Sequence, residues 1–296
     1  MKIEKWLHAH TSSLKGKNVA VTGTTGGLGR ELCRVLASCG ASLILLDRNK
    51  TRSEAFRNEL LTACPGLSVT CVRVDLEDVE SVYEATRQLL QMPIDLFIHN
   101  AGAYSIPRRT VQTGYDNVFQ INFASPYYMI RRLLPALRSR GGKVVVVGSI
   151  AHAYSKTDPR DVDFATRRQA SLVYGNAKRY LMFSLYALFE KEQDVSLSVT
   201  HPGIAVTNIT AHYPKWLYAL IKYPMKVIFM KPKKACLSIV AGVFDTCRYG
   251  EWIGPRVFDV WGYPKKRRLT TVDITEQAAI AVAADAVYDA MTATEP

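Results

Sequence analysis

A tyrosine and a lysine stand four residues apart in the stretch VYGNAKRY, at Tyr174 and Lys178. On a helix, residues i and i+4 share a face, so both side chains could point into one cleft. A phenol can protonate a newly formed alkoxide near neutral pH only if its pKa falls from about 10 towards 7. A nearby ammonium group stabilises the phenolate, and Lys178 could supply that charge. The pair therefore predicts acid–base chemistry at the phenol of Tyr174.

Spacing alone is weak evidence, because Tyr218 and Lys222 repeat it. No serine at the end of an apolar run precedes that second pair. Tyr174, by contrast, follows the run KVVVVGS, which ends at Ser149, and precedes the helical pattern YLMFSLYALFEK. The Ser149 hydroxyl could hydrogen-bond a substrate oxygen beside the phenol. We therefore identify Tyr174 rather than Tyr218 as the candidate acid.

A glycine cluster, TGTTGGLG, lies directly after the first apolar run and before a helical pattern. Glycines at such a place let the backbone turn tightly and approach a pyrophosphate, and the following helix offers its N-terminal amides to the negative charge. Asp47 lies about 18 residues beyond Gly29, close to the ~20 expected for a carboxylate that binds the hydroxyls of an adenosine ribose. Asp47 favours NAD as the cofactor. Arg48 leaves NADP open, because it could contact a 2′-phosphate.

The elements that must position these residues alternate between strand and helix. Six short apolar runs are typical of strands, at 17–22, 41–47, 68–75, 95–99, 143–149 and 196–201, and segments of helical period lie between them. This order predicts right-handed crossovers and a parallel sheet, in which ligands bind beyond the carboxyl ends of the strands. The expected fold class is α/β, a Rossmann-like, doubly wound parallel sheet in a single domain of residues 17–296, after an N-terminal extension of residues 1–16.

Taken together, the motifs resemble the short-chain dehydrogenase/reductase family over most of the chain. TGTTGGLG resembles its glycine-rich loop, VDLED the segment whose aspartate lies near the adenine, HNAGAY the NAG motif, FQINF the helix with a functional asparagine, and HPGIAVTNI the PG loop. The glycine loop also fits the sugar-nucleotide epimerase branch, but the NAG motif and the short C-terminal part argue against it. The wide gap between Ser149 and Tyr174, together with the PG loop, is similar to retinol dehydrogenase-like members.

The resemblance implies roles for individual residues. Tyr174 would be the acid–base group, Lys178 would also hold the nicotinamide ribose, Ser149 would orient the substrate, and Asn122 would support a proton relay through water. With Asp47 and Arg48, the expected cofactor-binding residues are Gly23, Thr25, Gly27, Leu28, Gly29, Asp47, Arg48, Asp75, Asn100, Ala101, Gly102, Tyr174, Lys178, Pro202, Gly203 and Thr207. No metal site is expected.

Residues 208–234 alternate apolar side chains with lysines. The pattern predicts a substrate cover at about residues 203–234, a shallow contact with an anionic membrane, or an ordinary packing helix. The basic stretch WGYPKKRRL, at 261–269, is interpreted as a solvated surface. We expect an apolar alcohol or ketone, retinoid-like, steroid-like or a fatty alcohol, as the small-molecule substrate.

Composition sets the remaining expectations. The formal net charge of +12 favours phosphates, anionic cofactors or an acidic membrane surface, and no apolar run reaches the ~20 residues of a membrane span. The six cysteines show no metal-ligand spacing, which predicts free thiols in a cytoplasmic protein, with peripheral membrane contact left open and no nucleic acid expected. The resemblance implies a homodimer or homotetramer. Two alternatives remain: a dinucleotide-binding regulator or scaffold without turnover, and a nucleotide-sugar epimerase or dehydratase.

Overall fold

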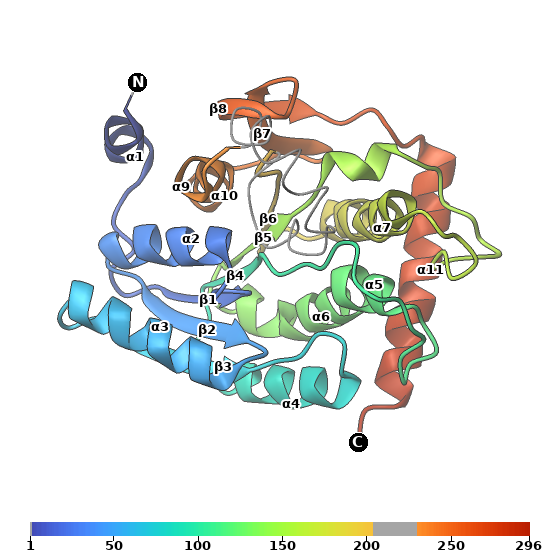
Figure 1. Cartoon of the computed structure of the whole chain (residues 1–296), viewed down its shortest axis with the longest axis horizontal. Coiled ribbons are helices and arrows are strands. Elements are labelled where there is room, and N and C mark those ends of the chain that lie inside the picture. The colour runs from blue at the N-terminus through green and yellow to red at the C-terminus, as the bar shows by residue number, and fades with distance from the viewer. Residues whose placement is uncertain (1, 204–229) are drawn as a thin grey trace, which may run out of the picture.

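The computed structural model describes residues 2–203 and 230–296. Within these ranges the chain forms one eight-stranded sheet, in the order β3-β2-β1-β4-β5-β6-β7-β8, with helices on both faces (Figure 1). The six predicted strands are present as β1 (Asn18–Thr22), β2 (Ser42–Asp47), β3 (Val69–Arg73), β4 (Leu96–His99), β5 (Lys143–Val147) and β6 (Ser196–Thr200), and they pair in parallel. The predicted α/β class and doubly wound sheet are confirmed.

Two layers of helices explain why these strands are apolar at consecutive positions, since a sheet covered on both faces has no polar side. One layer holds α1 (Ile3–His10), α2 (Gly27–Ser38), α3 (Lys50–Ala63) and α10 (Leu237–Phe244), and the other holds α4 (Val79–Leu90), α6 (Ser125–Arg138), α7 (Ala170–Glu190) and α11 (Ile274–Ala293). The short elements are α5 (Asn117–Phe119), the π-helix η1 (Gln120–Ala124), the 3-10 helix η2 (Ile150–Ala153) and α9 (Pro232–Ala235). The loops at the carboxyl ends of the strands are therefore the part of the sheet that can carry a site.

Two further strands extend the sheet beyond β6. β7 (Glu251–Val257) pairs with β6 in parallel, and β8 (Trp261–Arg268) pairs with β7 in the antiparallel direction. The sequence analysis predicted neither strand. The stretch WGYPKKRRL, which contains β8, shows no apolar alternation. β8 is the edge strand, where lysines, arginines and Pro264 are tolerated because one side of the backbone has no strand partner. The sheet is thus mostly parallel, with one antiparallel strand.

The N-terminal extension packs onto the domain through α1. The side chain of Trp6 is 3% exposed, and its ring lies 6.4 Å from the ring of Tyr263 on β8. Lys233 of α9 forms an ion pair with Glu4 of α1. These contacts hold α1 beside α9 and β8, at the top of Figure 1.

The C-terminal helix α11 is fixed to α7 by a buried ion pair. α11 packs along α7 and α6. Neither it nor any other helix of the described residues is long and apolar enough to cross a membrane. Arg179 of α7, 3% exposed at its side chain, donates from Nε and Nη2 to the two carboxylate oxygens of Glu276, at 2.8 and 2.6 Å. It also donates to the carbonyl oxygens of His152 and Thr271. The guanidinium is therefore held by α11, by the segment just before it and by η2.

We expect Glu276→Gln to lower the free energy of unfolding by about 3 kcal/mol, because it leaves a buried guanidinium without its counter-charge. The matched control is Asp285→Asn, which removes the partner of Arg131 on the exposed side of the same helix and should cost less than about 1 kcal/mol. Urea denaturation measures both. Equal losses in the two variants would contradict an anchoring role for Glu276.

Candidate active site

The glycine-rich loop joins β1 to α2 in a conformation that its glycines require. Gly23 has φ +71°, and its N–H donates to the carbonyl oxygen of Leu46 at 2.8 Å. A Cβ on Gly29 would lie 2.2 Å from the carbonyl oxygen of Gly23, so only glycine fits where α2 crosses the loop. Gly26 caps α2 without any side-chain hydrogen bond. The first amides of α2 are therefore free to bind an anion.

The NAG motif fixes the end of β4 against this loop. Nδ2 of Asn100 donates to the carbonyl oxygens of Thr22 and Gly23, at 3.0 and 3.1 Å. A Cβ on Gly23 would lie 3.0 Å from Cα of Ala101, so the two loops touch backbone to backbone. This contact forms one wall of a cleft at the carboxyl ends of β1, β2 and β4.

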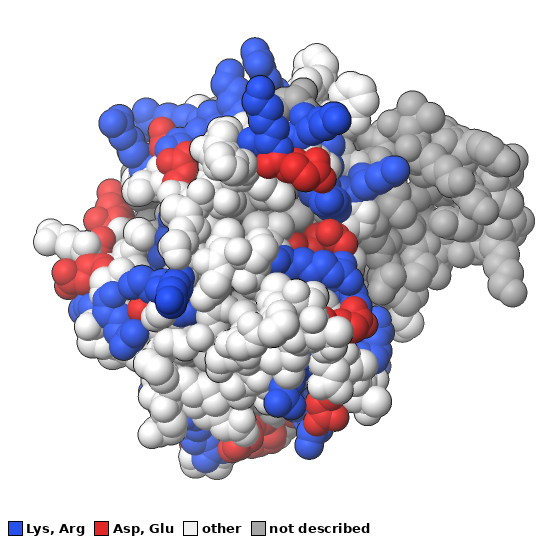
Figure 2. Space-filling view, turned by 90° about the vertical axis from the view of Figure 1, so that its left-hand side faces the viewer, with Lys and Arg blue, Asp and Glu red and all other residues white. Residues whose placement is uncertain are grey.

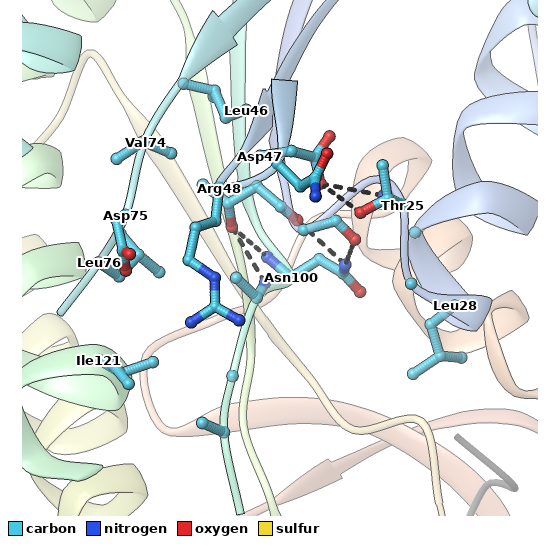
Figure 3. Close-up of a pocket in the computed structure, with 18 of the residues that line it drawn as sticks. Thr25, Leu28, Leu46, Asp47, Arg48, Val74, Asp75, Leu76, Asn100 and Ile121 are labelled. Carbon is cyan, nitrogen blue, oxygen red and sulfur yellow. Dashed lines mark hydrogen bonds between the residues drawn. The ribbon is translucent and has the colours of Figure 1, made fainter. Parts of the chain in front are cut away.

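The cleft has a volume of about 420 Å³, within the range of small-molecule sites. It brings together eleven of the residues expected to bind the cofactor, namely Gly23, Thr25, Gly27, Leu28, Gly29, Asp47, Arg48, Asp75, Asn100, Ala101 and Gly102. Figure 3 shows that they come from opposite walls, with Leu28 facing Asp75 and Ile121 across the opening. The lining also includes Arg52 and Tyr104, which the sequence analysis did not name.

Asp47 lines the cleft, but its carboxylate is already engaged. Oδ1 accepts hydrogen bonds from the amide and the hydroxyl of Thr25, both at 3.0 Å, and Oδ2 accepts from the hydroxyls of Ser53, at 3.1 Å, and Thr24. A carboxylate offers about four acceptor positions, so these donors fill it. The expected contact between Asp47 and a ribose would have to displace one of them. The side chain of Arg48, by contrast, extends into the cleft (Figure 3).

α7 brings Tyr174 and Lys178 to the end of β5. A Cβ on Gly175 would lie 2.3 Å from the carbonyl oxygen of Ala151, so α7 packs in close contact with η2, directly after Ser149. The amine of Lys178 lies 5.7 Å from the centre of the Tyr174 ring and donates to the carbonyl oxygen of Val147 at 2.9 Å. The predicted group of Ser149, Tyr174 and Lys178 is thus assembled at one place.

Asn122 reaches the same place from a π-helical turn, η1, and such turns are frequent at functional sites. Its Nδ2 donates to the carbonyl oxygens of Ala103 and Val118, both at 2.8 Å, and its Oδ1 accepts from the amide of Ala103 at 3.2 Å. A Cβ on Gly102 would lie 2.9 Å from Oδ1 of Asn122 and 3.5 Å from Nζ of Lys178. The side chain of Asn122 therefore holds the NAG loop against the lysine.

In the chain without a cofactor, burial opposes the expected effect of Lys178 on the phenol. Burial raises the pKa of Tyr174 to about 12, against the opposing effect of the Ser149 hydroxyl. Burial also lowers the pKa of Lys178 to about 7. An amine that loses its proton near neutrality is a weak source of positive charge. Desolvation, which the sequence does not display, is the main cause of both shifts.

His99, at the end of β4, is a residue that the sequence analysis missed. Its Nδ1 lies 3.1 Å from Oγ1 of Thr22, and that oxygen accepts hydrogen bonds from the amides of Asn100 and Ala101. A hydroxyl has two acceptor positions and one proton, so Thr22 must donate to Nδ1. The imidazole is therefore neutral, in keeping with burial, which together with the charge of Lys178 lowers the pKa of His99 well below its usual value. A histidine directly before the NAG motif was the available signal.

Tyr104, the last residue of HNAGAY, was also missed. Its ring meets the Tyr174 ring edge-on, with centres 5.3 Å apart. Tyr104 thus covers the phenol on the side of the cleft. An aromatic residue next to the NAG motif was the signal in the sequence.

The PG loop follows β6 on the same edge of the sheet. Pro202 is buried, and Gly203 has φ +76°. A Cβ on Gly203 would lie 2.5 Å from the carbonyl oxygen of Val260, so the loop contacts the turn between β7 and β8. Thr207, the alternative pair Tyr218 and Lys222, and most of the predicted substrate cover lie outside the described residues.

Comparison with known proteins identifies the family. The model of the short chain dehydrogenase family matches residues 17–158. A probable oxidoreductase of Streptomyces antibioticus is 31% identical over 203 residues, which cover 67% of this chain and 68% of that protein. The chain belongs to the short-chain dehydrogenase/reductase family. It is therefore an oxidoreductase of the class that uses a nicotinamide dinucleotide, NAD or NADP.

Two further relatives share less sequence identity with this short-chain dehydrogenase. The chloroplastic short-chain dehydrogenase TIC 32 A of Brassica napus is 28% identical, with 69% of this chain and 68% of the relative covered. Human retinol dehydrogenase 13 is 26% identical, with 68% and 62% covered. These relatives differ in their names, so they do not define one substrate.

Solved structures support the fold. An uncharacterized protein of Mycobacterium paratuberculosis aligns with a TM-score of 0.75 and 22% identity over 95% of this chain and 96% of its own. A short-chain dehydrogenase of Sphingobium yanoikuyae, solved in complex with NADPH, aligns with a TM-score of 0.60 and 21% identity over 77% and 84%. At these identities the likeness concerns the fold alone.

The buried amine gives a test of the electrostatics that does not need turnover. We expect Lys178→Met to raise the free energy of unfolding by about 2 kcal/mol at pH 7. The substitution removes the cost of burying the amine, for which each unit of pKa shift corresponds to about 1.4 kcal/mol. The loss of the hydrogen bond to Val147 offsets part of this gain. The pKa of Lys178 is lower in the folded chain than its usual 10.5. Between about pH 7 and 10.5 the unfolded chain therefore binds the extra proton, and wild-type stability rises with pH.

The gain from Lys178→Met should accordingly shrink as the pH rises from about 7 to 9.5. Guanidinium denaturation at the two pH values measures it, with Lys191→Met, at an exposed site just beyond α7, as the control. A gain that does not change with pH would show that Lys178 is not desolvated.

Proposed function

We propose that this short-chain dehydrogenase transfers a hydride between NADP and a hydroxyl or carbonyl group of a mostly apolar substrate, of retinoid-like, steroid-like or fatty-alcohol type. The observation that carries the proposal is the meeting of Ser149, Tyr174 and Lys178 beside the cleft, where Gly102 of its lining lies next to Lys178 and Tyr104 of its lining meets the Tyr174 ring. Each of these groups lies at the carboxyl end of a strand or on the helix packed beside it. This is the place where a doubly wound sheet holds its ligand.

The residues present fit a dinucleotide. The uncapped amides of α2 suit a pyrophosphate, and Gly29 lets the start of α2 lie against the glycine loop that would hold it. When bound, the nicotinamide ring supplies or accepts the hydride and, in its oxidised form, a positive charge. The protein supplies the rest, because Asn100 holds the glycine loop and Asn122 holds the NAG loop beside Lys178.

Ser149 and Tyr174 would bind the substrate oxygen and move its proton. Both hydroxyls lie together, and the Ser149 hydroxyl favours the phenolate over the phenol. The amine of Lys178, with a pKa of about 7, can give or take a proton near neutral pH. Tyr104 limits the access of water to the phenol from the cleft side. The geometry thus supports acid–base chemistry at an alcohol or ketone.

Apolar side chains around the phenol support an apolar substrate. Ile106 and Leu172 pack with Tyr174 onto the buried cluster of Val118 and Phe164. The name of human retinol dehydrogenase 13 is consistent with the expected retinol dehydrogenase-like branch. A substrate cover at about residues 203–234 remains a proposal, because residues 204–229 are not described.

We expect Tyr174→Phe to lower kcat with a working alcohol by about a thousandfold, since it removes the acid–base group. The matched control is Tyr154→Phe, which makes the same chemical change at an exposed tyrosine just after η2 and should leave turnover unchanged. Cofactor reduction followed by absorbance measures both. Turnover by Tyr174→Phe near the wild-type rate would refute the assignment.

The same assay separates the two alternative functions. A dinucleotide-binding regulator or scaffold would bind the cofactor and turn over no alcohol or ketone in a broad panel. A nucleotide-sugar epimerase or dehydratase would release no stoichiometric reduced cofactor. Release of one reduced cofactor per oxidised alcohol excludes both.

Two arginines support NADP over NAD. Arg48 and Arg52 both line the cleft beside Asp47, whose carboxylate is filled by Thr24, Thr25 and Ser53. Paired arginines suit a 2′-phosphate, because guanidinium groups bind phosphate through charge-assisted hydrogen bonds. The NADPH complex of the Sphingobium yanoikuyae dehydrogenase is in keeping with this choice. The sequence had favoured NAD, on the assumption that Asp47 would be free to bind the ribose.

We expect Arg48→Ala and Arg52→Ala each to raise the Kd for NADP by about tenfold or more, while the Kd for NAD changes less than about twofold. The control is Arg57→Ala, since Arg57 lies on α3 like Arg52 but does not line the cleft. Calorimetric titration with both cofactors measures the effect. Tighter binding of NAD than of NADP by the wild-type chain would contradict the proposal.

Pairing into a homodimer or homotetramer and contact with a membrane stay predictions. If long helices form the pairing surface, α11 takes part in it, because it lies on α6 and α7. Arg131 of α6 forms an ion pair with Asp285 and stacks over Tyr288 of α11.

A further inference from the structure

The turn between β7 and β8 exposes apolar side chains. Three of the large exposed apolar residues of the described chain lie within five consecutive positions: Val257 is 41% exposed, Phe258 85% and Trp261 51%. Single exposed apolar residues are common, but a group of them at one place marks an interaction site. Neither the cleft nor the catalytic group uses these side chains.

The turn holds Phe258 outward in a strained conformation. Phe258 and Asp259 have φ +51° and +55°, in the left-handed region that bulky residues seldom adopt. The turn is held by a hydrogen bond from the amide of Val260 to the carbonyl oxygen of Val257, and Arg267 binds both Asp259 and the carbonyl oxygen of Arg256. Strain that the surrounding bonds maintain at an exposed phenylalanine points to a function for its position.

Positive charge surrounds the exposed rings. The exposed cations of the hairpin are Arg256, Lys265 and Arg268, and Lys231, Lys233 and Lys234, in and just before α9, lie beside them. Nζ of Lys234 lies 5.8 Å from the centre of the Trp261 ring. Of the carboxylates beside this region, Asp245, Asp259 and Glu4 are each paired with a lysine or arginine, and Glu251, on β7, lies opposite Arg268. Figure 2 shows lysine and arginine side chains gathered at the top of the molecule, at the height of α1 and β8.

We propose that the hairpin patch, formed by residues 256–268 and by Lys231, Lys233 and Lys234, docks on the surface of an anionic lipid bilayer. Aromatic rings at the boundary of headgroups and acyl chains, with cations beside them, are the usual arrangement of interfacial anchors. Nucleic acid binding is less suited, because the rings stand at the end of a hairpin turn rather than along a groove that follows a strand.

The patch lies at the carboxyl edge of the sheet, on which the cleft also opens. The carbonyl oxygen of Val260 lies against Gly203, in the loop after β6, and Met230 is buried at the same contact. Docking would therefore place the carboxyl edge of the sheet near the bilayer. An apolar substrate could then enter from the lipid phase, a step that rests on the proposed function, whereas docking itself does not.

The test is flotation of the full chain with two kinds of vesicle: neutral phosphatidylcholine, and phosphatidylcholine with about one third phosphatidylserine. We expect at least about tenfold tighter binding to the anionic vesicles, with a loss of similar size when salt rises from about 0.05 to 0.5 M. Equal binding to both vesicle types, or no binding, would overturn the proposal.

Substitutions locate the surface. Phe258→Asn, a residue that tolerates positive φ, combined with Trp261→Ser, should reduce vesicle binding at least about tenfold without loss of thermal stability. Ile274→Ser, which changes a residue 89% exposed on α11, is the control. Unchanged binding by the double variant would refute docking through the hairpin patch.

A charge-matched pair of triple variants tests the cations. The triple variant Lys231→Gln, Lys234→Gln and Lys265→Gln should weaken vesicle binding by about fivefold per lysine. The control triple variant, Lys15→Gln, Lys156→Gln and Lys191→Gln, changes exposed lysines elsewhere and alters the net charge equally. It should have little effect on vesicle binding. Equal losses of vesicle binding in the two variants would mean that net charge alone drives binding, and would overturn docking through the hairpin patch.

Measuring turnover and vesicle binding in the same variants distinguishes failure of the docking proposal from failure of the proposed function. Tyr174→Phe should bind vesicles as the wild type does, and Phe258→Asn should retain turnover of a short water-soluble alcohol. Vesicle binding by a chain that turns over no substrate would sustain docking and refute the enzyme assignment. Binding of a single-stranded oligonucleotide that needs Trp261, without vesicle binding, would refute docking in favour of nucleic acid.

Discussion

The amine of Lys178, buried at the centre of the carboxyl edge, is the constraint on which the site depends. Removing an ammonium group from water is costly unless the fold supplies partners. Here the partner is the carbonyl oxygen of Val147 at the end of β5, and Gly102 leaves space for the amine. β5, the NAG loop, η1 and α7 must therefore meet around one atom. The close contact of Gly175 with Ala151 fixes α7 there.

That burial also decides the acid–base properties of the site. The protein alone raises the pKa of Tyr174 and lowers that of Lys178, so neither group is ionised in the way that a catalytic phenolate requires. His99 adds no charge, because its contact with Thr22 keeps the imidazole neutral. In the proposed function, the positive charge that favours the phenolate comes with the oxidised cofactor. Binding of the cofactor and acidity of Tyr174 are then linked.

The two ends of the site use charge differently. At the adenosine end, the carboxylate of Asp47 accepts hydrogen bonds from Thr24, Thr25 and Ser53, and Arg48 and Arg52 line the cleft beside it. At the other end, the hairpin patch presents lysines, among them Lys234, next to exposed rings. The formal net charge of +12 is therefore concentrated in part at places where anions would bind.

The sequence by itself determined the strands β1 to β6, the glycine loop and the group of Ser149, Tyr174 and Lys178, because each depends on short-range signals. Apolar runs mark buried strands, glycines mark close backbone contacts, and the i, i+4 spacing sets a shared helix face. Only the tertiary structure decided the hydrogen bonds that fill Asp47, the pKa values of Tyr174 and Lys178, and the antiparallel β8. These features depend on desolvation and on partners from distant segments, which local patterns do not encode.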